Sequence, residues 1–176
     1  MKDKTLTTPQ ALRYSRQILL SGFDLDKQEI LINSSILMIG AGGLGCAASQ
    51  YLVAAGIGKI TIVDDDIVES TNLQRQVLHF ENSIGEKKVD SAKRTLGNIN
   101  HFVEVNAVDK RPSAKELNEL VSQDDLMLDC TDNLATRNLL NDLCYQNNKP
   151  LVSGAAIRME GQVFCVIQER KTACYR

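Results

Sequence analysis

A short glycine-rich segment is the first part of the sequence whose residue types suggest chemistry. Residues 40–45 read GAGGLG, which fits the pattern G-x-G-x-x-G, directly after an apolar run. Gly40 permits a tight turn, Gly42 lets the backbone approach a phosphate, and Gly45 lets a following helix pack closely on the strand. The amino terminus of that helix would offer unpaired N–H groups to an anion. The segment predicts a nucleotide-binding loop.

An acidic residue supports this interpretation. Asp64 follows the next apolar run, at about the separation from Gly40 where a carboxylate grips a ribose hydroxyl. Glycines also form tight turns that bind no ligand, and the loop by itself does not distinguish ATP from NAD.

Cations and amides in three further segments favour ATP chemistry. Residues 64–76, 85–88 and 128–133 lie at or beyond the carboxyl ends of expected strands, where an open parallel sheet binds its ligands. Cations neutralise charge that develops on phosphates, and a carboxylate can hold the magnesium ion that organises them. A dehydrogenase needs no such cations. The candidates for binding nucleotide in these segments are Asp64, Asp66, Thr71, Asn72, Leu73, Gln74, Arg75, Lys88, Asp132 and Asn133.

Alternating strands and helices must position these residues. The expected strands are 35–39, 59–63, 103–108, 126–129, 150–156 and 162–168, and the expected helices are 44–55, 87–99, 114–121 and 134–146. This alternation predicts an α/β fold, a Rossmann-like and mainly parallel sheet with helices on both faces. The last two strands are expected to pair antiparallel through residues 159–161.

Two helices are expected before the first strand. Thr8 is expected to cap one of them, with Pro9 at its first position, and the other is expected over 24–33. The chain is therefore divided into a helical segment, 1–34, an ATP-binding domain, 35–170, and a last short segment, 171–176.

Composition excludes several classes of protein. The net charge of −2 gives no broad field that would draw the chain to nucleic acid or an anionic membrane. The first residues contain no apolar signal-peptide core, and no run is long enough to span a bilayer. The five cysteines are scattered in apolar segments, as expected for buried thiols in a reducing cytoplasm.

Ordered motifs along nearly the whole chain resemble the MoeB/ThiF/HesA family of ubiquitin-activating-enzyme-like adenylyltransferases. They are RYSRQ at 13–17, the glycine loop, NLQRQ at 72–76, Lys88, CTDN at 130–133, VSGAA at 152–156 and CYR at 174–176. The resemblance implies that ATP binds with Gly43 near its phosphates and Asp64 on its ribose. It also implies that Asn72, Arg75 and Lys88 hold the triphosphate.

The same resemblance implies the reaction. The carboxylate of a Gly-Gly tail, on a ubiquitin-like sulfur-carrier protein, attacks the α-phosphate of ATP and releases pyrophosphate. Asp132 would bind Mg²⁺, and Arg16 would reach from one subunit of a homodimer into the partner's ATP site. The expected pathway is molybdenum cofactor (molybdopterin) biosynthesis, with the small subunit of molybdopterin synthase as carrier. The equivalent step in thiamine thiazole synthesis is the alternative.

Simpler interpretations of the candidate catalytic residues exist. Arg16 could be a solvated helix arginine, Lys88 an exposed neighbour of Lys87, and Asp132 a helix cap, since aspartate favours that position. An NAD-dependent oxidoreductase would share the glycine loop but leave these cations unexplained. A non-catalytic dimerising fragment is a further alternative.

The remaining histidines and cysteines are expected to be structural. His79 and His101 are interpreted as surface or loop residues, and Cys130 as a small buried side chain. In the resembling family, Cys174 would be the first ligand of a structural zinc site made of two Cys-x-x-Cys pairs. The sequence stops one residue before the second ligand, so we expect a fragment with an incomplete zinc site.

Overall fold

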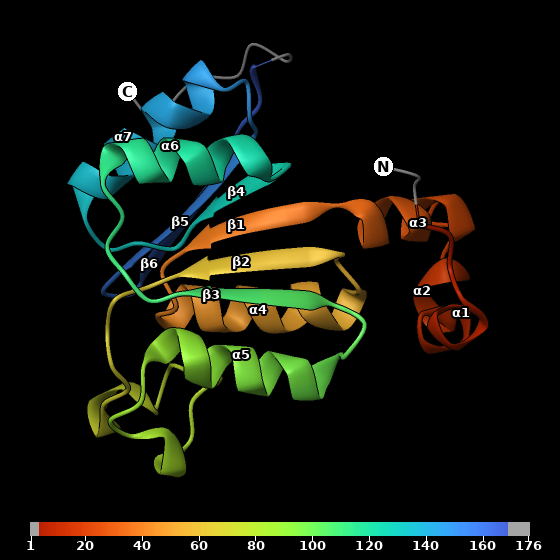
Figure 1. The fold of residues 1–176 in the computed structure, drawn as a ribbon, viewed down its shortest axis with the longest axis horizontal. Helices are drawn as coiled ribbons and strands as arrows, with labels where there is room; N and C mark the ends of the chain where they lie inside the picture. The colour runs from red at the N-terminus through yellow and green to blue at the C-terminus, as the bar shows by residue number, and fades with distance from the viewer. Residues whose placement is uncertain (1–3, 169–176) are drawn as a thin grey trace.

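The computed structural model describes residues 4–168 as a twisted sheet between two layers of helices (Figure 1). The strands are β1 Ser35–Ile39, β2 Lys59–Val63, β3 Glu104–Val108, β4 Leu126–Asp129, β5 Leu151–Ile157 and β6 Glu160–Val166. The helices are α1 Thr8–Arg13, α2 Ser15–Ile18, α3 Leu25–Asn33, α4 Gly43–Ala55, α5 Lys88–Ile99, α6 Ala114–Gln123 and α7 Leu134–Gln146, with short 3-10 turns η1 Ser70–Asn72 and η2 Glu81–Ser83. None of these helices is long and apolar enough to cross a membrane.

The strand order is β3-β2-β1-β4-β5-β6. All neighbours pair in parallel except β5 and β6, which pair antiparallel. The chain leaves β1 first toward β2 and later returns to the other side of β1 at β4, which makes the β1/β4 boundary the topological switch point of a Rossmann-like fold. The expected fold class is confirmed.

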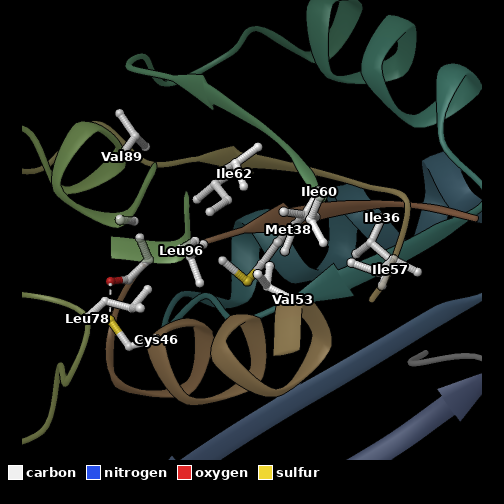
Figure 2. Close-up of a cluster of buried hydrophobic side chains, with 14 residues drawn as sticks. Ile36, Met38, Cys46, Val53, Ile57, Ile60, Ile62, Leu78, Val89 and Leu96 are labelled. Atoms are coloured by element: carbon white, nitrogen blue, oxygen red, sulfur yellow. Dashed lines mark hydrogen bonds between the residues drawn. The ribbon is translucent and has the colours of Figure 1, made fainter. Parts of the chain in front are cut away.

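Each face of the sheet has its own core. Helices α4 and α5 cover one face, and α6 and α7 cover the other (Figure 1). The first core joins Met38 and Ile62 of the central strands to Val53 of α4 and Leu96 of α5 (Figure 2). The second core joins side chains of the same strands to α6 and α7. The central strands are buried from both sides, which explains their continuous apolar runs.

Two local expectations were wrong by one or two residues. The cap of α1 is Thr7, whose hydroxyl accepts from Gln10 N while the Gln10 side chain accepts from Thr7 N, so the helix begins one residue earlier. The β5–β6 turn consists of Arg158 and Met159, because Ile157 pairs with Glu160. Arg158 has a φ of 58°, the left-handed backbone that a two-residue hairpin requires.

Helices α1–α3 pack at the end of the sheet where β1 and β2 begin, against the last residues of α4 (Figure 1). Gln17 and Gln28 both donate to the carbonyl of Ala55, at 2.8 and 3.0 Å. The buried ring of Tyr14 lies so close to Gly56 that a Cβ there would be 2.5 Å from Tyr14 Cζ. These contacts close the carboxyl end of α4, which Gly56 terminates with a φ of 90°.

Candidate nucleotide-binding site

The glycine loop connects β1 to α4 and takes a shape that larger residues would not permit. Gly40 has a φ of 99°, and a Cβ there would lie 2.8 Å from the carbonyl oxygen of Cys130, at the end of β4. A Cβ at Gly45 would lie 2.0 Å from the oxygen of Gly40, so the first turn of α4 packs directly on the loop. The amino end of α4 carries no side-chain cap at Gly42, and its N–H groups are available to an anion.

Asp64, directly after β2, is hydrogen-bonded to the backbone of this loop. One carboxylate oxygen accepts from Ala41 N at 2.7 Å, and the other accepts from Asp66 N at 2.9 Å. A carboxylate has about four acceptor positions, so two positions are left for a ribose hydroxyl. Asp64 therefore lies where the sequence places it, and its role toward a ribose stays a prediction.

Lys88 is the first residue of α5, and its side chain pairs with Asp66, which follows β2. Its side chain is 8% exposed, and Nζ lies 2.7 Å from Oδ2 of Asp66, which is 67% exposed. The interpretation of Lys88 as an exposed neighbour of Lys87 is wrong, because Lys88 is buried. A buried ammonium whose carboxylate partner faces water can donate to a phosphate oxygen in place of that partner.

Arg75 lies beside the glycine loop. A Cβ on Gly43 would be 3.7 Å from Arg75 Cγ, and Arg75 Nη1 donates to the carbonyl of Thr71 at 2.9 Å. Asn72 is buried, and its amide oxygen accepts from Glu69 N at 3.2 Å, which shapes the η1 turn. The guanidinium is exposed and has further N–H donors for a phosphate.

The other candidates in this segment have local contacts. The hydroxyl of Thr71 donates to Glu69 at 3.3 Å, and the Gln74 amide donates to Thr71 O at the same distance. Leu73 is half-buried, and Thr71 and Gln74 are exposed. Their contact with nucleotide stays a prediction.

Asp132 and Asn133 follow β4 at the same edge. Asn133, rather than Asp132, caps α7 by accepting from Thr136 N at 2.9 Å. The interpretation of Asp132 as a cap is therefore wrong. The Asp132 carboxylate is exposed, and within residues 4–168 it forms no hydrogen bond or ion pair. It is available to a cation.

A buried ionic network beneath this turn was missed by the sequence analysis. Asp129 accepts from Thr131 N at 3.0 Å, from Thr131 Oγ1 at 2.7 Å and from Ser153 Oγ at 2.6 Å. Arg137 of α7 lies 4.0 Å from the same carboxylate and donates to the carbonyls of Thr131 and Gly154. The sequence does contain one signal for this network: Arg137 stands among the leucines on the apolar face of α7.

Arg16 lies far from these residues. It belongs to α2, two residues after Tyr14, which packs at the carboxyl end of α4, while the glycine loop lies at the amino end. The 13 residues of α4 separate these ends by about 20 Å. Arg16 is exposed and pairs with no acidic side chain in the part of the chain that the structure describes.

The histidines and cysteines differ from one another. His101 is exposed, as expected, but His79 is 4% exposed, and its interpretation as a surface residue is wrong. Burial raises the pKa of Cys130 to about 12 and that of Cys46 to about 11, so both thiols stay protonated at neutral pH. Cys130 packs against the first core as expected. Cys165 of β6 is exposed, so the expectation of a buried thiol is wrong for this residue.

Residues 4–168 contain no group of three or more His, Cys, Asp or Glu side chains that could hold a metal ion by themselves. Cys174 lies outside the described residues. A magnesium ion commonly takes one or two carboxylates together with substrate phosphates, so the free carboxylate of Asp132 fits that mode of binding.

Fold and site together define a class of protein: a Rossmann-like domain whose glycine loop, cations and free carboxylate meet at the carboxyl edge of the sheet. The sequence comparisons identify the family. The model of the ThiF family matches residues 14–176, and the chain belongs to this family. The expected family membership is confirmed.

Relatives of known name are adenylyltransferases. The chain is similar to the molybdopterin-synthase adenylyltransferase of Escherichia coli (strain K12), with 50% identity over 97% of this chain and 69% of the relative. Identity to the enzyme of the same name from Haemophilus influenzae is 47%, over 97% of this chain and 70% of the relative. Identity to the adenylyltransferase and sulfurtransferase MOCS3 of Culex quinquefasciatus is 46%, over 97% of this chain and 39% of that protein.

Solved structures show the same fold. The structure of E. coli MccB with ATP has a TM-score of 0.84 and 29% identity, over 93% of this chain and 51% of that chain. The structure of PaaA has a TM-score of 0.81 and 29% identity, over 93% of this chain and 52% of that chain. This chain therefore spans about half the length of these solved proteins.

Proposed function

We propose that this protein uses ATP to adenylylate the C-terminal Gly-Gly carboxylate of a ubiquitin-like sulfur-carrier protein, with release of pyrophosphate. The support is a site with Arg75 beside Gly43 of the glycine loop and with the buried Lys88 and the exposed Asp132 at the same edge of the sheet. The chain is also 50% identical to a molybdopterin-synthase adenylyltransferase. An NAD-dependent oxidoreductase would share the loop but would have no use for these groups.

The site's own groups suggest how the reaction is promoted. The carrier carboxylate forms a bond to the α-phosphorus, and the bond from that phosphorus to the pyrophosphate oxygen breaks, which leaves an acyl-adenylate. Arg75 and Lys88 stabilise negative charge as it grows on the phosphates. Asp132 would hold Mg²⁺, which when bound supplies further charge neutralisation. The protonated thiol of Cys130 takes no part, because the substrate carboxylate is the nucleophile.

Exchange of labelled pyrophosphate into ATP tests this function. The protein is incubated with Mg²⁺, ATP and the small subunit of molybdopterin synthase, and the control carrier lacks the last two glycines. We expect exchange with the intact carrier alone. Binding of ATP without exchange would favour a non-catalytic module, and stabilisation by NAD rather than ATP in thermal unfolding would favour the oxidoreductase.

The carrier identifies the pathway. We place the protein in molybdenum cofactor biosynthesis, because the relatives of 47–50% identity carry that name. Substituting the sulfur carrier of thiamine thiazole synthesis tests the alternative. Faster exchange with that carrier would reassign the pathway and leave the chemistry unchanged. A cytoplasmic location remains part of the same proposal, as does a structural zinc site that Cys174 would complete only with further cysteines of a longer protein.

A homodimer would bring Arg16 to a nucleotide site, although Arg16 lies far from the glycine loop of its own subunit. Because Arg16 lies at the end of α4 opposite the glycine loop, its guanidinium would act on the phosphates of a partner subunit. Arg16→Ala and Lys88→Ala should then each be inactive, and mixing them should restore activity. Random exchange would make about half the molecules heterodimers, each with one intact site, and about a quarter of wild-type activity should return. Verified exchange without recovery would refute the trans site.

A further inference from the structure

His79 occupies a position that the sequence analysis did not anticipate. It lies in the segment between η1 and η2, is 4% exposed, and its backbone N–H donates to the carbonyl of Gln76 at 3.0 Å. Its Nδ1 lies 2.9 Å from Ser91 Oγ, and its Nε2 lies 3.7 Å from Cys46 Sγ. Ser91 is one helical turn after Lys88, and Cys46 is in the first turn of α4.

The hydrogen-bond roles in this group are determined by one thiol. Cys46 Sγ donates to the carbonyl of Ala41, inside the glycine loop, at 3.2 Å (Figure 2). Because burial raises the pKa of Cys46 to about 11, its sulfur carries a single proton, which this bond uses. The sulfur can then only accept from His79, so Nε2 carries the imidazole proton. Nδ1 is left as the acceptor of the Ser91 hydroxyl.

Burial also lowers the pKa of His79, and the nearby charge of Lys88 acts in the same direction. A hydrogen bond to the Ala41 backbone opposes them. The neutral imidazole has one donor and one acceptor, as the chain of bonds from Ser91 to Ala41 requires.

We propose that His79 is a positioning residue that sets the distance between the glycine loop and Lys88. It connects the three segments that carry the expected phosphate ligands: the loop, through Cys46 and Ala41; the Asn72–Gln76 segment, through its own backbone; and α5, through Ser91. No atom of His79 needs to touch substrate. The role rests on the proposed adenylylation, because Lys88 matters there as a phosphate ligand.

The network has two arms: the bond from His79 to Ser91 of α5, and the contact from His79 through Cys46 to the glycine loop. Removing one arm distinguishes a positioning role from a role in overall stability. Ser91→Ala removes the bond between His79 and α5, and we expect kcat to fall by roughly 10- to 100-fold, since small displacements of a catalytic group have effects of this order. The dissociation constant for ATP should change less than about threefold. Thr95→Val is the matched control, because Thr95 donates to Leu78 O at 2.8 Å from one turn further along α5. It should have nearly wild-type kcat. Equal losses in both variants would overturn the proposal.

Amide substitutions at His79 test the two arms separately. Glutamine can place its terminal amide near the position of Nε2, and asparagine near that of Nδ1. His79→Gln should retain the arm to the loop and reproduce the low kcat of Ser91→Ala, while His79→Asn should retain the arm to α5 and raise KM for ATP. If both variants show the same combination of a lower kcat and a higher KM, the contacts of His79 to α5 and to the loop do not act separately.

A measurement on the resting protein keeps this inference distinct from the proposed function. Nitrogen-15 NMR of labelled histidine should show His79 neutral and protonated at Nε2 near pH 7, with a change in the Nδ1 signal in Ser91→Ala. An Nδ1-protonated or charged ring would overturn the positioning role even if pyrophosphate exchange is found. If exchange is absent while this tautomer is found, the adenylylation proposal fails and the His79 network stands.

Discussion

Two pairs of opposite charge lie at the same edge of the sheet and differ in exposure. In the pair Lys88–Asp66 the lysine is 8% exposed and the aspartate 67%, and in the pair Arg137–Asp129 both side chains are below 10%, at 8% and 1%. The Asp129 carboxylate also accepts three hydrogen bonds, and Arg137 donates to two carbonyls. We call the Lys88–Asp66 pair open, because water or a ligand can replace the exposed aspartate. We call the Arg137–Asp129 pair closed, because both charges are buried and hydrogen-bonded, and it shapes the turn that carries Asp132.

The difference shows how a site can combine reactivity with rigidity. A charge that must meet a ligand needs a partner that water can replace, because a fully satisfied pair has no free donor. A charge that holds backbone needs the opposite, because a buried ion is stable only when its hydrogen bonds are complete. Removing the open groups should therefore affect catalysis, and removing the closed groups should affect folding.

The largest effect is expected at Asp132, three residues after the closed Asp129. Asp132→Ala should abolish magnesium-dependent pyrophosphate exchange, because the free carboxylate is the expected Mg²⁺ ligand. The melting temperature should stay within about 2 °C, as for most exposed substitutions. Asp65→Ala, which removes an exposed carboxylate nearby, is the control. Exchange near the wild-type rate would exclude Asp132 from the site.

Arg137→Met should have the largest effect on stability. Removing one partner of a buried pair leaves the other charge uncompensated and costs about 3–5 kcal/mol. Urea unfolding measures this loss. The double variant with Asp129→Asn should recover part of it, because no buried charge then remains. If the single variant lowers the free energy of unfolding by less than about 1 kcal/mol, Arg137 and Asp129 do not form a stabilising buried pair.

Arg75→Ala and Lys88→Ala should each lower turnover by on the order of 10²–10³, with a smaller change in ATP affinity. Both cations are expected to act on charge that develops during the reaction. Lys93→Ala, an exposed lysine on α5, is the control for removing a positive charge. A raised KM with unchanged kcat would make the two residues ground-state binders.

The smallest effect is expected for Asp66→Asn. Lys88 is buried, but Asp66 is 67% exposed, so water can replace the carboxylate at Lys88 Nζ. The loss should therefore resemble that of an exposed pair, at most about 1 kcal/mol. The free energy of unfolding should therefore change by less than this amount in urea titrations. A loss of several kcal/mol would show that Asp66 and Lys88 form a structural pair, and the contrast with Arg137 would disappear.

The fold and the glycine loop could be predicted because their causes are local. Apolar runs of strand length and a loop that only glycine permits at Gly40 and Gly45 leave few alternatives. Asp24 was expected at the start of the second helix, and it caps α3 by accepting from Lys27 N at 3.2 Å.

The buried polar groups could not be predicted in this way. Each of His79, Asp129 and Arg137 has at least one partner on another element of the fold, namely Cys46, Ser153 and Gly154, and a single sequence records no such pairing. The hairpin turn was misplaced for a related reason. Register between β5 and β6 places Glu160 in a strand although its residue type favours a turn or surface.

Helix α4 is held at both ends by contacts that leave no space. At one end the Cβ-free surface of Gly45 rests on the oxygen of Gly40, and at the other the Tyr14 ring rests on Gly56. Because neither contact leaves room for a side chain, α4 fixes the distance between the glycine loop at its amino end and the Tyr14 ring at its carboxyl end, about 20 Å away. A larger residue at either glycine would therefore have to displace the whole helix rather than a single side chain.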